Sequence, residues 1–584
     1  MSSTPEHPGG SERTAPEDAE NAVDAAEAAA ERAQRREAVL KAHRRSRRWR
    51  GRALAAAAGA GAMVLVGGVA VVGSISPAVM PEVDGAAHPA RLTASAASMV
   101  CPPAPRLPEG AAAGTDTEFS PVSTSAEWTS RVLLLSDLAG RVPGAVVSPV
   151  GAEPGSEGER LTPAQPVDLQ QGAPATAGQD GVPVQQASVH SVPGGRDLAA
   201  GQLTTVEPLG GQAALASAVT GYTAQDGDLA GLAAADCQAP AHRHWLTGAS
   251  TTLRTTSVLT LVNPSTTAST VDLDLLGADG PVEAPGARGI VLAPGESTSV
   301  VLAGLAPDQE HVAVRVMASG GAVTAGIQQH RLDGVTPAGV ELIQPGAEPS
   351  ATAVVPGVRI PSATVLEELS DPAAGPSVLI AAPVTSGPTR AEVSVIGPDG
   401  EVDLPEPAEV DLAPGSAVRV PLAGVPRGEY TVTVSAEGPV VASARGLDTM
   451  EAELPEGGDA QPVDRAIMPA AAPLGLEQLV ALPSHARSHL VLAAPDGGAV
   501  ELTAVHADGS VGQPHEQEVA AGRQVRLDVR ELADDGQRVA GLVITTTAGS
   551  VHAGLTQRSA QGISAVPVRA EPEQAAGIPV RVRP

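Results

Sequence analysis

Two short histidine-containing segments carry side chains at spacings that metal sites use. In "CQAPAHRHW", His242 and His244 closely follow Cys237, and thiolates and imidazoles are zinc ligands. In "HARSH", His485 and His489 lie four residues apart, a spacing that suits zinc on a helix. The second segment lies between a proline and a strand-like apolar run, which argues against a helix there. We expect His242 and His244 to be surface residues and neither segment to bind metal.

The sequence contains no local motif of a known catalytic centre. It lacks G-x-S-x-G, H-E-x-x-H, a phosphate-binding loop and a G-x-G-x-x-G that opens a helix. The acidic residues around Asp279 do not have the spacing of a calcium loop. A Ser-His-Asp set that meets only in space stays open as an alternative. We predict no catalytic, cofactor-binding or metal-binding residue.

Aromatic side chains are rare and most of them fall in one region. The chain has three tryptophans, two tyrosines and one phenylalanine. Aromatic rings supply the flat apolar surface on which sugars stack. The alternative is that these rings form a sparse hydrophobic core. If the protein has a binding site, we expect it in residues 88–245, which hold Phe119, Trp128, Tyr222 and Trp245.

The elements that must position these residues begin with a predicted membrane span. Residues 53–76 are uncharged, and at 1.5 Å per residue they reach roughly 36 Å, enough to cross a hydrocarbon core of about 30 Å. Six arginines lie directly before this run: Arg44, Arg45, Arg47, Arg48, Arg50 and Arg52. Basic flanks stay in the cytoplasm. We therefore predict a single-pass membrane protein with a cytoplasmic N-terminus and an extracytoplasmic C-terminal region; a cleaved signal peptide is the alternative.

Charge and cysteine content fit two compartments. Residues 1–52 contain 11 basic and 9 acidic residues, whereas the remaining chain has a net charge of −31. So acidic a region repels nucleic acid, and we expect no nucleic-acid partner. The two cysteines, Cys101 and Cys237, both lie beyond the span, where an oxidising compartment favours one disulfide. Two free thiols or a metal pair are the alternative.

Three segments align without gaps and indicate a repeat. They are "TVDLDLLGADG" (270–280), "RAEVSVIGPDG" (390–400) and "AVELTAVHADG" (499–509). Apolar and polar residues alternate in each, which predicts a strand with one buried face, and Asp-Gly predicts a hairpin turn at its end. Each repeat continues with a glycine turn before a strand, and then with a strand–glycine turn–strand unit such as "EYTVTVSAEGPVVASA" (429–444).

These patterns predict a mainly β protein with tandem immunoglobulin-like or fibronectin-like β-sandwich domains, after a cytoplasmic helix and one transmembrane helix. Proline- and glycine-rich stretches such as "QPGAEPSATAVVPG" (344–357) and "ELPEGGDAQPV" (453–463) are predicted to be linkers. The predicted parts are a disordered or helical cytoplasmic tail (1–52), the transmembrane helix (53–76), a linker (77–87), a divergent β-domain (88–245) and three sandwich repeats (246–345, 370–450 and 485–570).

The chain resembles an uncharacterised actinobacterial family of membrane-anchored proteins, the domain of unknown function 5719. The resemblance rests on "HWLTGAS", "LTLVNPSTTASTVDL" and "APGES", with "CPPAP" and "ADCQAP" upstream. It covers about residues 50–570 and its motifs are structural. It implies a cell-envelope location and a genomic setting near cell-surface glycosyltransferases, and it supplies no catalytic residue.

The sequence thus favours a non-enzymatic scaffold or accessory protein of the cell envelope, with the membrane and an envelope glycosyltransferase or another cell-wall protein as partners. The first alternative is a module that binds wall glycan or protein through residues 88–245. The second is an enzyme of an unrecognised class.

Overall fold

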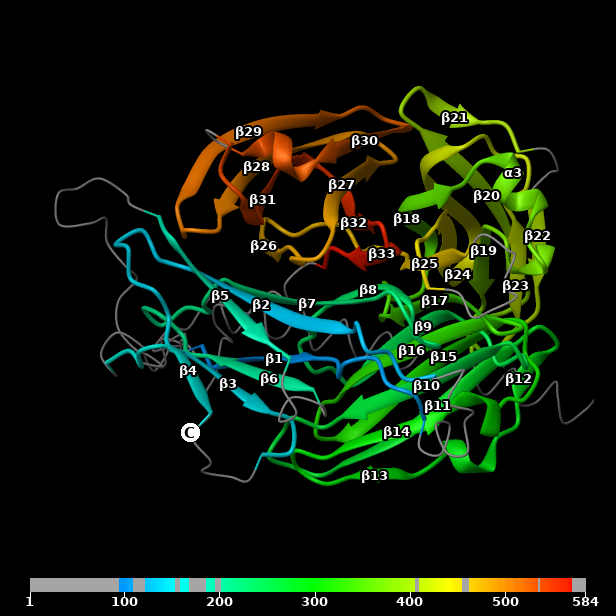
Figure 1. Ribbon diagram of the computed structural model, residues 1–584, viewed down its shortest axis with the longest axis horizontal. Coiled ribbons are helices and arrows are strands. Elements are labelled where there is room, and N and C mark those ends of the chain that lie inside the picture. Colours follow the sequence, from blue (N-terminus) through cyan, green and yellow to red (C-terminus); the bar gives the residue numbers. More distant parts are fainter. Residues whose placement is uncertain are drawn as a thin grey trace, which may run out of the picture. The chain divides into compact units, whose positions relative to one another are not determined.

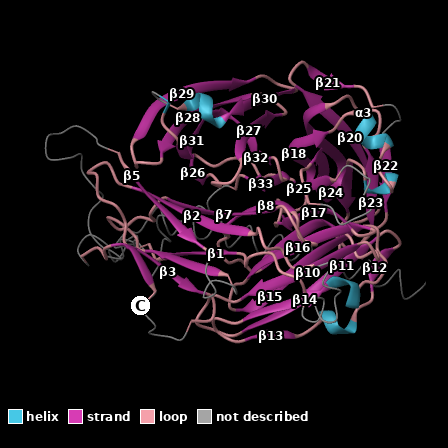
Figure 2. Cartoon of the chain, viewed as in Figure 1, coloured by secondary structure: helices cyan, strands magenta, loops and turns pink. Residues whose placement is uncertain are grey.

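The computed structural model describes most of the chain beyond the predicted span, and this part is mainly β (Figures 1 and 2). The described residues fall in one compact unit, Ala90–Ile578. No helix among them is long and apolar enough to cross a membrane; the predicted tail and span (1–76) lie outside them. The described ranges are 94–108, 121–152, 158–166, 185–194, 201–404, 409–453, 462–533 and 536–569.

Two four-stranded sheets form the first sandwich, in the orders β1-β6-β3-β4 and β5-β2-β7-β8. Side chains from both sheets, among them Val132, Val147 and Val206, share one buried core. Its strands are β1 (Ala97–Cys101), β2 (Glu127–Leu135), β3 (Ala145–Pro149), β4 (Glu159–Thr162), β5 (Ala187–Pro193), β6 (Gln202–Val206), β7 (Ala216–Ala224) and β8 (Gly231–Asp236).

The second sandwich packs the sheet β14-β10-β16-β17 on the sheet β12-β11-β15-β9, to which β13 adds beside β11. Leu259, Leu273, Val314 and Ile327 are fully buried between the two sheets. Its strands are β9 (Arg243–Ala249), β10 (Thr255–Val262), β11 (Ser269–Gly277), β12 (Gly280–Val282), β13 (Ile290–Leu292), β14 (Ser297–Val301), β15 (Val312–Gly320), β16 (Thr324–Asp333) and β17 (Thr336–Ile343).

The third sandwich is built around one long strand, β24, which pairs with β18 and β20 through its first half and with β19 and β25 through its second. The prediction of two strands joined by a glycine turn is therefore wrong for residues 429–444. Its strands are β18 (Ser350–Ile360), β19 (Ser377–Ala381), β20 (Thr389–Gly397), β21 (Gly400–Val402), β22 (Glu409–Leu412), β23 (Ala417–Pro421), β24 (Gly428–Thr449) and β25 (Val463–Pro469), and its short helix is α3 (Ala363–Glu367).

Backbone conformation explains why β24 continues where the other two repeats reverse. At the corresponding turns, Gly320 has φ +93° and Gly549 has φ +67°, which is the left-handed region that a tight reversal uses. Gly438 does not have a positive φ. The chain therefore passes from one sheet to the other without turning back.

The fourth sandwich packs β26-β31-β28-β29 on β30-β27-β32-β33. Leu490, Leu502, Leu542 and Leu555 are fully buried in its core. Its strands are β26 (Glu477–Ala481), β27 (Arg487–Ala494), β28 (Gly498–His506), β29 (Val511–Val519), β30 (Arg523–Asp528), β31 (Val539–Gly549), β32 (His552–Ser559) and β33 (Gly562–Pro567).

The aligned repeat segments form equivalent hairpins, which confirms that part of the prediction. They are β11–β12, β20–β21 and β28–β29, each antiparallel around the Asp-Gly sequence. The alternation also holds, since Leu273, Val393 and Leu502 are buried and Glu392 is exposed. The linker prediction for residues 344–357 is wrong, because β18 begins at Ser350 and absorbs its Pro-Gly pair where the register with β24 shifts.

Four edge strands, one from each sandwich, contact one another in a closed cycle (Figure 1). β8 packs against β17 and β33, and β25 packs against the same two strands. Each of the four pairs with a neighbour on one side only. An edge strand exposes unpaired backbone N–H and C=O groups, so burying four of them together requires other partners for these groups. We call this cycle the junction.

Candidate functional site

An apolar hollow of about 510 Å³ lies against the outward face of the second sandwich. The strands β10, β14 and β16 supply its floor with side chains that include Val258, Thr260, Val262, Ser299 and Val301. In β10 these alternate with Leu259 and Leu261, which point into the core. The two-residue period of the strand thus gives one face to the core and the other to the hollow. We call this hollow the groove.

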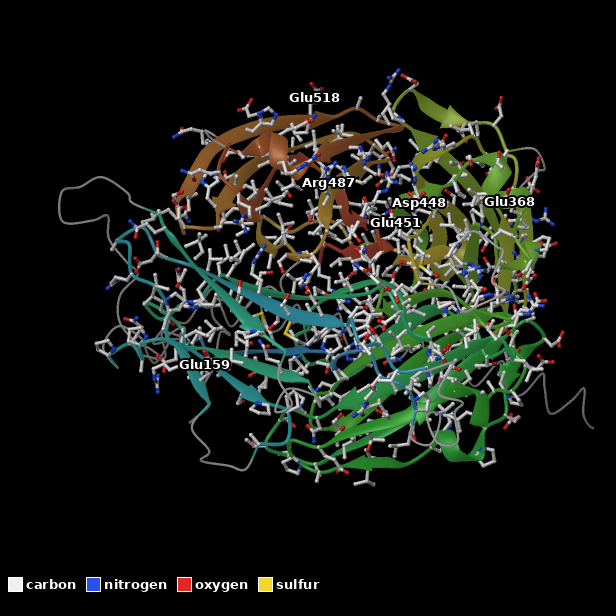
Figure 3. The ribbon with its side chains drawn as sticks, viewed as in Figure 1. Glu159, Glu368, Asp448, Glu451, Arg487 and Glu518 are labelled. Carbon is white, nitrogen blue, oxygen red and sulfur yellow. A yellow bond between two sulfur atoms is a disulfide. The ribbon has the colours of Figure 1, made fainter. Side chains whose placement is uncertain are left out.

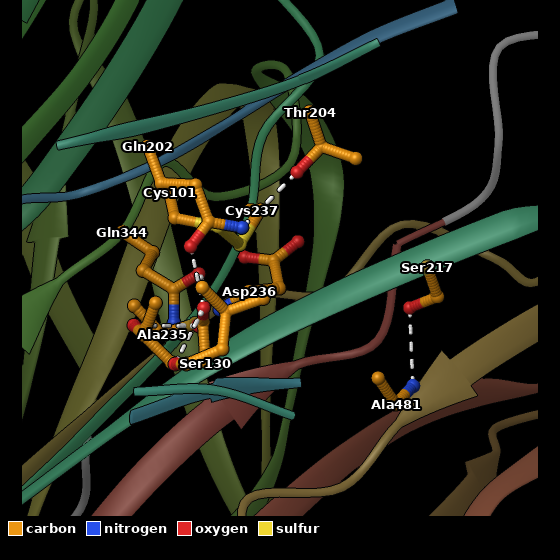
Figure 4. The surroundings of a disulfide bond; sticks show 12 residues. Cys101, Ser130, Gln202, Thr204, Ser217, Ala235, Asp236, Cys237, Gln344 and Ala481 are labelled. Carbon is orange, nitrogen blue, oxygen red and sulfur yellow. Dashed lines mark hydrogen bonds between the residues drawn. A yellow bond between two sulfur atoms is a disulfide. The ribbon is translucent and has the colours of Figure 1, made fainter. Parts of the chain in front are cut away.

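The segment that follows β1 forms one wall of the groove. Cys101 is joined to Cys237, which follows β8, by a disulfide with an S–S distance of 1.97 Å (Figure 4), as predicted. From there residues 102–108, "PPAPRLP", run along the groove. The side-chain amide of Gln328 accepts a hydrogen bond from the backbone N–H of Arg106 (2.9 Å) and donates one to its carbonyl oxygen (2.8 Å). A groove side chain therefore already binds the backbone of a proline-rich segment.

Two further amides in the groove have unused hydrogen-bonding atoms. Gln344 Oε1 accepts from the Asp236 N–H (3.1 Å; Figure 4), whereas its Nε2 is buried and has no partner among the described residues. Gln238 lies beside the disulfide, and its Oε1 is likewise buried without a partner there. A buried polar atom without a hydrogen bond costs about 1–3 kcal/mol. Both glutamines line the groove, and their two unpartnered atoms, one donor and one acceptor, are the complement of a peptide group.

The groove is lined mainly by apolar and uncharged polar side chains. Arg106 is the one ionisable side chain among the described residues that line it. General acid–base catalysis needs a group whose pKa lies near the working pH, and an arginine does not meet this requirement. The lining is suited to holding a ligand.

The aromatic residues predicted as binding candidates do not form a common platform. Trp245 is 3% exposed and packs between the second and third sandwiches, with the Arg315 guanidinium 5.4 Å from its ring centre. Tyr222 is 2% exposed and lies opposite Trp128, which is partly buried, in the β2–β7 pair. Burial raises the pKa of the Tyr222 hydroxyl well above its usual value. Phe119 lies outside the described residues.

The histidine segments are explained by packing. His244 is buried, which makes the expectation of a surface residue wrong; its Nε2 lies 2.7 Å from the Val323 carbonyl oxygen, and burial lowers its pKa. His242 is exposed as expected. His485 contacts Thr129 of the first sandwich through Nε2 (2.7 Å), and His489 lies within β27 and so not on a helix. Among the described residues no three metal-binding side chains lie together.

Sequence reasoning missed two acidic residues at the junction, Glu341 of β17 and Asp464 of β25. Asp464 is fully buried, and its Oδ2 accepts from the backbone N–H groups of Leu232 (3.1 Å) and Ile563 (3.0 Å). A Cβ atom at Gly562 would stand 2.0 Å from the same oxygen. One carboxylate thus satisfies two edge strands, and the glycine makes room for it.

Glu341 connects the remaining strands of the junction. Its Oε2 accepts a hydrogen bond from the Ile467 N–H (3.3 Å), and its Oε1 accepts one from the Ser564 hydroxyl (2.9 Å). The Ser564 hydroxyl oxygen in turn accepts a hydrogen bond from the Ala234 N–H (2.9 Å). Burial raises the pKa of Asp464 to about 8 and that of Glu341 well above its usual value, and the two carboxyl groups repel each other. The signal in the sequence was an acid within an otherwise apolar strand, as in "AGVELI".

Similarity to a protein-family model identifies the family of the chain. Residues 192–566 match the model of a family of unknown function, DUF5719. Because this match covers more than half of the chain, the protein belongs to that family, which confirms the family named from the sequence over residues 192–566. No curated protein matches the chain.

Proposed function

We propose that the protein is a membrane-anchored, extracytoplasmic, non-enzymatic scaffold of the cell envelope, and that its groove holds an extended polypeptide segment of an envelope protein. The carrying observation is the pair of orphaned amide atoms, Gln238 Oε1 and Gln344 Nε2, in an apolar groove without catalytic groups. A peptide bond supplies the donor and the acceptor that these atoms need.

The neighbouring segment of the chain itself supports this occupant. The groove already accommodates the proline-rich residues 102–108, held by the Gln328 amide. Prolines pre-organise an extended backbone and so lower the entropy lost on binding. A sugar is the weaker candidate, because no aromatic ring is among the described residues that line the groove.

A site-specific crosslink in cells tests the proposal. A photoreactive amino acid replaces Ser299 on the groove floor, and a matched probe replaces Val291, which is 65% exposed on β13 of the opposite sheet. We expect the Ser299 probe alone to form an adduct, and its fragment masses to map to one extended segment of one envelope protein. Thr260→Arg, which fills the groove, should abolish this adduct.

Three outcomes would overturn the proposal. An adduct with wall glycan would assign the groove to the alternative glycan-binding function. An adduct that forms equally from the Val291 probe would show that the groove has no special role. Turnover of an envelope substrate by the purified full-length protein would show that it is an enzyme.

A further inference from the structure

A second hollow, of about 520 Å³, lies where the first and fourth sandwiches meet, and four arginines line it. Arg131 reaches it from β2, Arg487 begins β27, Arg530 lies in the 3-10 helix Val529–Leu532, and Arg538 precedes β31. The described residues that line it include no acidic side chain. Such a concentration of positive charge stands out in a chain whose net charge is −29. We call this hollow the arginine hollow.

Most of this positive charge has no counter-charge in the described structure. Arg530 pairs with Asp528 through two nitrogens, of which Nε lies 3.0 Å from Oδ1. Arg487 (Figure 3) and Arg538 are exposed and form no ion pair with a described residue. Other exposed arginines are of both kinds: Arg390 pairs with Asp411 (2.9 Å), whereas Arg427 has no ion-pair partner among the described residues. Asp534 and Asp535 lie outside the described residues.

Arg131 supplies the second, independent observation, since its side chain is only 9% exposed. Its Nη1 donates to the carbonyl oxygen of Leu482 (2.6 Å), another residue that lines the hollow. Its Nε is buried and has no described partner. Burial and the nearby charge of Arg538 both lower the pKa of Arg131. A bound anion would satisfy the free N–H and relieve this repulsion.

We propose that the arginine hollow is a binding site for a phosphate-bearing ligand. Guanidinium groups bind phosphate oxygens through paired N–H donors. A single carboxylate would neutralise only one of the three unpaired arginines, whereas phosphate groups carry more charge and more acceptor oxygens. The volume exceeds that of one phosphate and lies in the usual range for small-molecule sites, about 300–1,000 Å³. The ligand is therefore a phosphate ester or diphosphate that carries an organic group.

Titration calorimetry of the full-length protein in a neutral detergent, with inorganic pyrophosphate as the probe, tests this site. We expect saturable binding that weakens as salt rises, and an affinity at least tenfold lower in the Arg487→Gln/Arg538→Gln double variant. Arg427→Gln is the matched control, because Arg427 is exposed in the third sandwich and has no ion-pair partner among the described residues. It should bind pyrophosphate as the unaltered protein does.

Further arms identify the source of the phosphate and the ways in which the proposal fails. If the protein binds micelles that contain phosphatidylglycerol, does not bind micelles that contain phosphatidylcholine, and is displaced by pyrophosphate, the ligand is a lipid headgroup. Pyrophosphate binding without micelle preference would indicate a soluble ester. The proposal would be overturned if pyrophosphate did not bind, or if the Arg427→Gln control lost affinity as much as the double variant. It would also be overturned if pyrophosphate bound only after Asp534→Asn/Asp535→Asn, because the chain would then neutralise its own arginines.

Discussion

The junction and the arginine hollow each gather ionisable side chains from two sandwiches, but they differ in what surrounds the charge. Glu341 and Asp464 are almost fully buried, and their oxygens accept hydrogen bonds from backbone N–H groups of the chain. Arg487 and Arg538 are exposed and have no ion-pair partner among the described residues.

This difference separates stability from binding. A buried carboxylate that satisfies several edge strands holds the sandwiches together, and its removal leaves buried donors without acceptors. An exposed arginine contributes little to the folded state and is free to bind a ligand. Changes at the junction should therefore alter unfolding, and changes at Arg487 and Arg538 of the arginine hollow should alter binding alone.

The largest effect is expected from Glu341→Ala. The substitution leaves the Ile467 N–H and the Ser564 hydroxyl without their acceptor and creates a cavity among β17, β25 and β33. We expect the free energy of unfolding to fall by about 4 kcal/mol, measured by denaturant titration of the full-length protein. Glu341→Gln keeps the shape and one acceptor and should cost less. Equal stability of all three proteins would refute a structural role for the carboxylate.

Loss of the disulfide should have the next largest effect. Cys237 follows β8 directly, so the bond to Cys101 restrains a strand of the junction across 136 residues of sequence. We expect Cys101→Ala/Cys237→Ala to lower the free energy of unfolding by about 3 kcal/mol. A reducing agent should reproduce this loss in the unaltered protein and have no effect on the variant. If the folded variant binds pyrophosphate as the unaltered protein does, the disulfide stabilises the junction without affecting the arginine hollow.

The junction should also give stability an unusual pH dependence. The pKa of Asp464 is raised to about 8 in the folded protein, so between its unfolded value near 4 and pH 8 the folded state binds more protons than the unfolded state. This contribution is present at low pH and is lost as pH rises. The stability of the unaltered protein relative to Asp464→Asn should fall by about 2 kcal/mol between pH 6 and pH 8. A difference that grows with pH would show that the carboxylate is ionised at the junction.

The smallest effect on stability is expected at the arginine hollow. Arg487→Gln and Arg538→Gln remove exposed charges without breaking an ion pair, so each should change the free energy of unfolding by less than about 0.5 kcal/mol. Thermal unfolding without added anion measures this. A loss comparable to that of Glu341→Ala would mean that both regions serve folding.

Local features could be predicted well from the sequence, whereas most contacts between residues far apart in the chain could not. Alternation and Asp-Gly turns identified β11, β20 and β28, and the cysteine count identified the disulfide. The groove could not be predicted, because Gln238, Gln328 and Gln344 come from separate elements and no local pattern marks them. The junction was missed for the same reason: β25 lies between the predicted repeats, and its contacts with β17 and β33 depend on packing alone.

The closed cycle of the junction also limits when the molecule can finish folding. β33 lies next to β8, although more than 300 residues separate them in sequence. Until the last strand has been synthesised and has reached its place, β8 and β25 each lack one of the two junction strands that pack against them. A chain synthesised from its N-terminus would therefore expose the edge of its first sandwich until β33 is in place. Truncation before β33 should leave that edge accessible to proteases and to pairing with other chains.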